Sequence, residues 1–143
     1  MKKCLAFTAA MLLFCNPVLG QSYDLLTRAE TGDVSAQVML GDMFAAGEGV
    51  PQDYVEAAYW YRLAAKRGIA KAQLSLGLLY SRGQGVKQNI EIAYQWASIA
   101  AAQGAQDAIE ARDLISGQLD AETRERAQQL ATRCSESQYK QCE

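Results

Sequence analysis

Ser137 and Lys140 form a Ser-x-x-Lys string, the spacing of a nucleophile and a neighbouring lysine in penicillin-recognising enzymes. The Ser-Asp-Asn and Lys-Thr-Gly motifs that accompany it in those enzymes are absent from the sequence. The string also lies between two cysteines at the end of the chain. We therefore interpret it as a chance match and predict no catalytic residue.

Other groups that could do chemistry are few, and histidine is missing altogether. Its absence removes the commonest general base, the usual catalytic triads and most zinc sites. Carboxylates at spacings of three share helix faces, and they are Asp107, Glu110, Asp113, Glu122 and Glu125. Such acids could perform acid–base chemistry or bind calcium, but the arginines beside them favour a solvated surface. We predict no metal site, no cofactor and no enzymatic activity.

Residues 1–20 have the three-part pattern of a secretory signal peptide: a positive start, an apolar stretch and a small Gly20 at the cleavage site. The apolar stretch is too short for a transmembrane helix, which needs roughly 20 residues. A lipoprotein signal would need a small residue before Cys15, where Phe14 stands. We therefore expect a mature chain of residues 21–143 that is exported to the periplasm of a Gram-negative bacterium, or secreted, without membrane insertion.

Cys134 and Cys142 remain after cleavage, an even pair in a compartment that favours disulfides. We predict that they form a disulfide that closes a short loop at the C-terminus. A redox role is the alternative, but redox pairs usually have the tighter Cys-x-x-Cys spacing.

The charge of the mature chain limits its partners. Without Lys2 and Lys3, 12 Lys and Arg remain against 16 Asp and Glu, and no basic run is present. Binding to nucleic acid or to anionic membranes depends on clustered Lys and Arg. We therefore expect neither as a partner.

Two consecutive segments, 33–68 and 69–104, align without a gap at a period of 36 residues and are identical at thirteen positions. A period of this length is typical of α-solenoids. Each unit predicts two helices, because apolar residues recur at helical spacing on both sides of a Gly-x-Gly-Val loop. The repeated structural positions are Leu40, Gly41, Gly47, Gly49, Trp60 and Gly68 in the first unit, and Leu76, Gly77, Gly83, Gly85, Trp96 and Gly104 in the second.

The glycine loop could in principle bind phosphate. Phosphate-binding loops follow a strand and carry Gly-x-x-x-x-Gly-Lys or Gly-x-Gly-x-x-Gly, and neither pattern is present. We predict that the loop only turns the chain. Gly41 and Gly77, which recur inside the first helices, predict close contact between helices.

The repeat pattern resembles the Sel1-like repeat family, relatives of the tetratricopeptide repeats. The motifs that carry the resemblance are A-x-x-x-L-G at 36–41 and 72–77, G-x-G-V at 47–50 and 83–86, and A-x-x-W-x-x-x-A-A-x-x-G at 57–68 and 93–104. The resemblance implies an all-α, right-handed solenoid of helix-turn-helix repeats with about seven helices. A half-repeat helix (21–32) would precede the two repeats, and a degenerate capping repeat (105–143) would follow, with Arg112 and Asp113 in place of Leu-Gly.

The resemblance also implies a protein–protein interaction module, an adaptor, regulator or scaffold that holds a peptide segment or helix in its concave groove. If the arrangement is tetratricopeptide-like, variable positions of the first helices line that groove: Ser35, Val38, Asp42, Lys71, Leu74, Leu78, Arg82, Asp107 and Glu110. Val38, Leu74, Leu78 and Leu114 would form an apolar strip, which suits a peptide or helix. A specific inhibitor or immunity protein for a toxin or enzyme is one alternative. A cell-wall-binding protein, or an enzyme acting on the cell wall or on β-lactams, is another.

Overall fold

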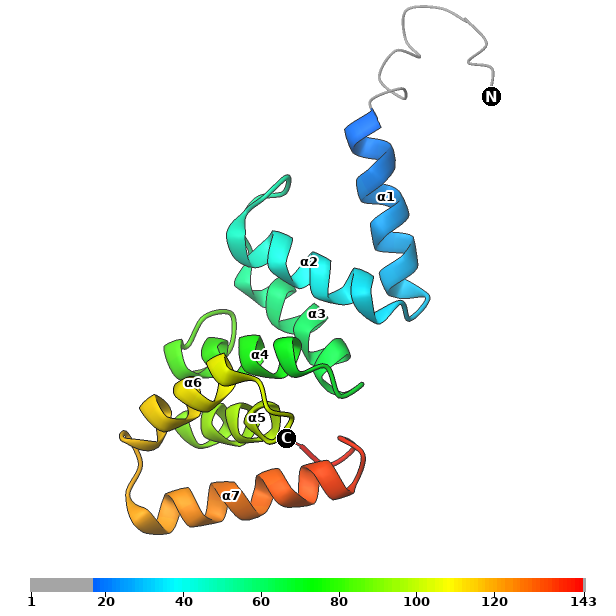
Figure 1. The fold of residues 1–143 in the computed structure, drawn as a ribbon. Coiled ribbons are helices and arrows are strands. Elements are labelled where there is room, and N and C mark those ends of the chain that lie inside the picture. Colours follow the sequence, from blue (N-terminus) through cyan, green and yellow to red (C-terminus); the bar gives the residue numbers. More distant parts are fainter. Residues whose placement is uncertain (1–16, 143) are drawn as a thin grey trace, which may run out of the picture.

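The computed structural model describes residues 17–142, which contain seven α-helices and no strand. The first five helices stack in chain order into an elongated array, and the sixth and seventh both pack against the fifth (Figure 1). The predicted all-α solenoid is confirmed. The helices are α1 (Pro17–Glu30), α2 (Val34–Ala46), α3 (Tyr54–Ala65), α4 (Ala70–Arg82), α5 (Ile90–Ala102), α6 (Gln106–Ser116) and α7 (Ala121–Glu136).

Side-chain caps set where several helices begin. The carboxylate of Asp53 accepts hydrogen bonds from the backbone N–H groups of Val55 and Glu56, at 2.8 and 3.2 Å. Asn89 caps α5 in the same way, and Asp33 and Asp120 cap α2 and α7. Such caps satisfy backbone donors that have no partner within the helix.

Two identical glutamines tie neighbouring helices together at the same point of each repeat. The buried amide of Gln37 donates to the carbonyl of Ala29 at 3.1 Å, and that of Gln73 donates to Ala65 at 3.1 Å. Each bond joins the end of one repeat to the first helix of the next. Both repeats have glutamine at this position because its amide supplies a hydrogen-bond donor to a carbonyl of the preceding helix. A buried carbonyl without a donor would lower the stability of the fold.

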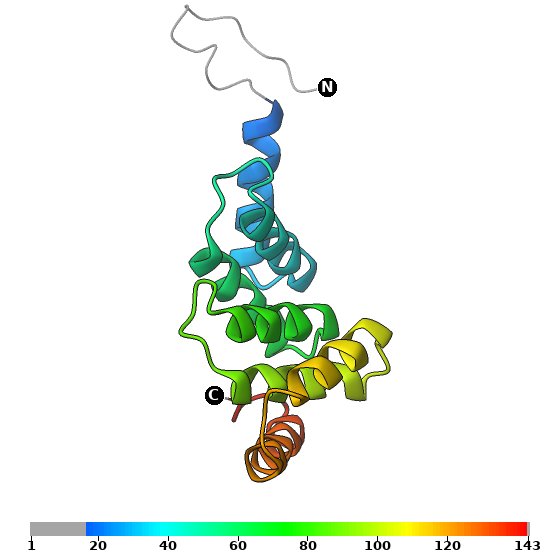
Figure 2. The same cartoon turned by 90° about the vertical axis from the view of Figure 1, so that its left-hand side faces the viewer.

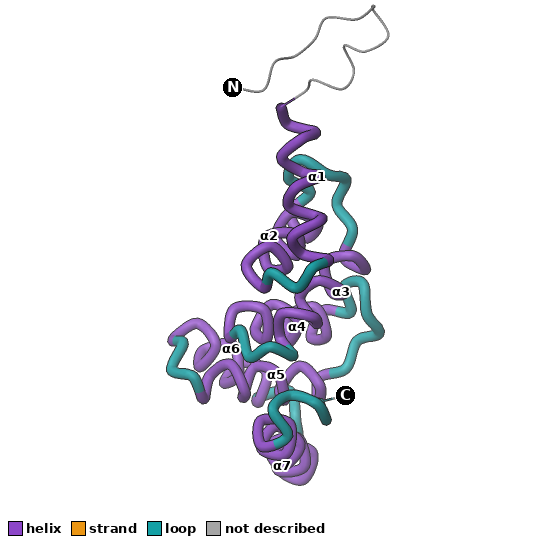
Figure 3. The backbone as a smooth tube through the Cα atoms, turned by 90° about the vertical axis from the view of Figure 1, so that its right-hand side faces the viewer, coloured by secondary structure: helices purple, strands orange, loops and turns teal. Residues whose placement is uncertain are grey.

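The glycine loops turn the chain between the two helices of each repeat, as predicted, and lie one above the other on the same side of the molecule (Figure 3). Gly47 and Gly83 are in the left-handed conformation and end α2 and α4. Gln52 and Gln88 then close the two loops, each donating to a carbonyl of the preceding helix at 2.8 Å.

Gly41 and Gly77 allow close contact between paired helices, which confirms that prediction. A Cβ at Gly41 would lie 2.5 Å from the Tyr61 ring. A Cβ at Gly77 would lie 3.1 Å from the carbonyl oxygen of Ala93 and 3.3 Å from Cβ of Trp96.

The third unit departs from the repeat. Helix α7 packs across α5 and hardly touches α6, whereas α3 pairs closely with α2 (Figures 1 and 2). In α6, Arg112 and Asp113 form an ion pair at the positions where the repeats have Leu-Gly, so α6 lacks the close contact that the repeat glycine gives to its partner helix. Ala127 and Ala131 of α7 are instead buried in the main core.

Candidate functional site

Four of the predicted groove residues come together in one place. Ser35, Val38 and Asp42 of α2 and Lys71 of α4 line a pocket of about 350 Å³. Val34, Met39 and Ile69 complete its lining. We call this the α2–α4 pocket.

The polar edge of the α2–α4 pocket is a three-residue cluster from three helices. One carboxylate oxygen of Asp42 accepts a hydrogen bond from the Tyr61 hydroxyl at 2.7 Å, and the other pairs with Lys71 Nζ at 2.6 Å. Burial of the phenol, and then its bond to the Asp42 carboxylate, raises the pKa of Tyr61 well above its ordinary value. Tyr61 therefore remains a neutral donor, and the paired Asp42 and Lys71 leave the edge without net charge.

Apart from Ser35, the rest of the pocket lining is apolar. Met39 is 51% exposed although it lies on a helix whose other face is buried. Val34, Val38 and Ile69 are half-buried and pack against the core. A flexible thioether beside aliphatic walls can adapt its shape to an incoming apolar side chain.

One member of the predicted apolar strip, Leu74, is buried in the structure and is therefore not available to a partner. Leu74 is only 9% exposed and packs in a cluster with Ala100 and Ala108, and Leu78 lies against the same cluster. These leucines hold α6 against the preceding repeat. Leu114, the last member of the strip, is 77% exposed.

The three charged residues predicted farther along the groove do not line the α2–α4 pocket. Arg82 is exposed at the end of α4. Asp107 and Glu110 are exposed on α6, where Asp107 accepts from the backbone of Ala108 and Glu110 accepts from Gln106. The structure thus brings together the α2 positions and Lys71, and leaves the α6 positions apart.

Met39, Ile69 and Tyr61 belong to this site although the sequence did not single them out for it. Met39 and Tyr61 correspond to Ser75 and Ala97 one period later, so neither belongs to the repeat signature. The failure to repeat is itself a usable signal, because positions that vary between repeats are free of the common packing requirement.

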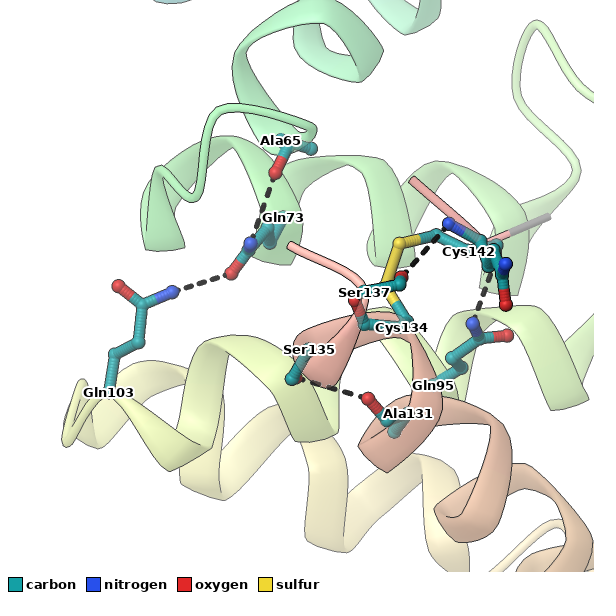
Figure 4. The surroundings of a disulfide bond; sticks show 10 residues. Ala65, Gln73, Gln95, Gln103, Ala131, Cys134, Ser135, Ser137 and Cys142 are labelled. Carbon is teal, nitrogen blue, oxygen red and sulfur yellow. Dashed lines mark hydrogen bonds between the residues drawn. A yellow bond between two sulfur atoms is a disulfide. The ribbon is translucent and has the colours of Figure 1, made fainter. Parts of the chain in front are cut away.

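Ser137 has a structural role at the end of α7. Its hydroxyl donates to the carbonyl of Cys134 at 2.8 Å and accepts from the backbone N–H of Gln141 at 3.1 Å (Figure 4). These bonds turn the chain so that Cys142 reaches Cys134, and the two form the predicted disulfide. The hydroxyl is engaged with backbone groups, which supports the interpretation of Ser-x-x-Lys as a chance match.

Residues 17–142 contain neither a cluster of metal-binding side chains nor a membrane-spanning helix. No three His, Cys, Asp or Glu side chains there gather into a group that could hold a metal ion. None of the helices described is both long and apolar enough to cross a membrane.

A family model for the Sel1 repeat matches residues 34–69 and 70–104. No curated protein matches the chain in sequence.

Two solved structures are similar to the fold. One is a protective antigen present in uropathogenic Escherichia coli strains that displays an SLR fold, with a TM-score of 0.77 and 28% identity over 82% of this chain. Another is a Sel1 repeat protein from Oxalobacter formigenes, with a TM-score of 0.61 and 36% identity over 65% of this chain. The matched region spans only 26% and 38% of those two proteins.

Proposed function

Because the chain belongs to the Sel1-like repeat family, we propose that it is an interaction module that binds a segment of another protein in the α2–α4 pocket. Sel1 repeat proteins generally mediate protein–protein interactions. The observation that carries the proposal is a pocket with an exposed methionine and aliphatic walls, bordered by an ion pair that neutralises itself. Such a surface suits an apolar side chain of a peptide or helix.

The pocket also fits the way repeat arrays bind. Stacked helix pairs form a curved surface to which successive first helices contribute. In this chain α2 and the start of α4 leave a pocket between them, whereas α4 and α6 are joined through Leu74 and Leu78. One partner side chain inserted beside Met39 would therefore be the anchor of the complex.

Export to the periplasm is part of the proposal. It rests on the signal-like pattern of residues 1–20, of which residues 1–16 lie outside the described part of the chain. A disulfide between Cys134 and Cys142 is in keeping with an oxidising compartment. The expectation that the protein is not an enzyme stays a prediction.

The first experiment places a photo-crosslinking residue at Met39, and at Val55 of α3 as a matched exposed control. We expect a discrete protein to be cross-linked from position 39 and not from position 55. That protein is then identified and purified, and its affinity for this chain is measured.

The affinity measurement uses Ser35→Arg with Met39→Glu, two exposed positions whose substitution leaves the core intact. Since anchors at interface centres dominate binding energy, we expect about tenfold weaker binding or more. The matched variant Val55→Glu should bind like the native chain. Equal affinity for all three chains would rule out the α2–α4 pocket as the binding surface.

An inhibitory or immunity role would use the same surface. It would differ in that the captured protein is an enzyme or toxin whose activity falls on binding. An activity assay of the purified partner therefore separates an inhibitor from a scaffold.

A further inference from the structure

A second pocket, of about 500 Å³, lies between α5, α7 and the tail that follows α7. Its lining combines apolar surface from Ile92 and Leu130 with the cations Arg133 and Lys140. A neighbouring pocket shares Ile92 and adds Val86 and Lys87. The two therefore form one continuous surface, which we call the basic pocket.

The cations of the basic pocket stand out because the chain as a whole is acidic. Within residues 17–142, Lys87, Arg133 and Lys140 form no ion pair. The nearest acid on α5, Glu91, is paired with Arg126. Three cations that form no ion pair with any described residue, arranged around an apolar centre, favour anionic partners.

The floor of the basic pocket contains a polar group suited to a peptide. Gln95 is 3% exposed, and its Nε2 donates to the carbonyl of Cys142 at 2.7 Å (Figure 4). Its Oε1 accepts no hydrogen bond from the described residues. A backbone N–H of a bound chain could donate to this oxygen, whereas a simple anion carries no such donor.

From these observations we infer that the basic pocket binds an acidic peptide segment, with aliphatic side chains on Ile92 and Leu130 and carboxylates beside Lys87, Arg133 and Lys140. The spread of the cations along the surface suits a chain that carries several acids. The site uses α5, α7 and the tail, so it is independent of the α2–α4 pocket.

The test measures binding of a fluorescent peptide of repeated Asp-Leu-Glu triplets to the purified chain by anisotropy. The test variant is Arg133→Glu with Lys140→Glu, both exposed side chains. We expect about tenfold weaker binding, because two favourable charge pairs are lost and each reversed charge repels the acidic peptide. Binding of the native chain should also weaken as salt is raised.

Three controls make the result specific. Lys66→Glu with Arg124→Glu reverses the same number of exposed charges outside the basic pocket and should leave binding unchanged. Met39→Glu, in the α2–α4 pocket, should also leave it unchanged, so failure here is separate from failure of the proposed function. Far-ultraviolet circular dichroism and the unfolding midpoint confirm that each variant is folded.

Four outcomes would overturn the inference. The first is equal binding by the native and the Arg133 and Lys140 variants. The second is unchanged binding of a peptide with Asn and Gln in place of its acids, or with Ser in place of Leu. The third is equally tight binding of inorganic polyphosphate, which would identify a surface that binds anions without specificity. The fourth is binding that appears only in the Glu143→Gln variant. Glu143 directly follows the pocket residue Cys142, so this result would mean that its negative charge prevents the native chain from binding an acidic peptide.

Discussion

Gly85 shows most clearly how single residues determine the close packing between repeats. Its φ is +68°, and a Cβ there would lie 2.0 Å from the carbonyl oxygen of Tyr54 at the start of α3. The second glycine loop therefore lies directly against the first repeat. By contrast, Gly32 has a φ of +96°, but a Cβ added to it would have no neighbouring atom within 4 Å.

These two glycines give a matched prediction. Gly85→Ala should lower the free energy of unfolding by about 3 kcal/mol, because it adds a backbone clash to an unfavourable φ. Gly32→Ala should cost only about 1 kcal/mol, because only the φ is unfavourable. Urea unfolding of both variants measures the difference. Equal losses would mean that the loop moves away from α3 without cost.

At the scale of helices, the important departure is that α7 leaves the repeat register and lies across α5. Arg126 of α7 forms two hydrogen bonds with the Glu91 carboxylate of α5, at 2.7 and 3.0 Å. These bonds hold the pKa of Glu91 below its usual value. The ion pair therefore links the attachment of α7 to pH.

The sign of this linkage follows from the direction of the shift. A carboxylate with a lowered pKa in the folded state contributes stability above its unfolded value, and that contribution is lost as pH falls through the folded pKa. Glu91→Gln should therefore show a smaller loss of stability than the native chain between about pH 7 and about pH 3. Urea unfolding at both pH values measures this. The exposed Glu48→Gln is the control, and a native-like acid dependence of Glu91→Gln would contradict the prediction.

At the scale of the whole molecule, the tail joins the end of the chain to its middle. Cys134 and Cys142 are buried, and their disulfide holds the tail where Gln95 bonds to Cys142. Tyr139 reaches farther, since a Cβ on Gly68 at the end of α3 would be 2.9 Å from its ring. The tail thus contacts elements from both repeats.

Removal of the disulfide tests the role of the tail. Cys134→Ala with Cys142→Ala should lower the free energy of unfolding by about 2.5 kcal/mol, because a closed loop limits the freedom of the unfolded chain. A reducing agent should destabilise the native chain by a similar amount and leave the double variant unchanged. If the reducing agent also lowered the free energy of unfolding of the double variant, its effect could not be assigned to the disulfide.

Much of the fold could be predicted from the sequence alone. The sequence predicts the 36-residue repeat, the close contacts at Gly41 and Gly77 and the disulfide, and all of them are present in the structure. These features depend on residues that act on near neighbours in the chain or at the same point of each repeat. Their information is therefore local and periodic.

The surfaces available for binding were decided only by the tertiary structure. The Asp42 cluster joins residues 19 and 29 positions apart, and the basic pocket joins α5 to a helix that leaves the repeat register. Leu74 and Leu78 fill the space between the first helices α4 and α6, whereas α2 and α4 leave a pocket between them. The difference depends on how side chains of different repeats fill the shared space. The helices and the stacking of the two repeats follow from local and periodic patterns in the sequence. The position of α7 and the open surfaces come from packing between distant side chains, which no local pattern records.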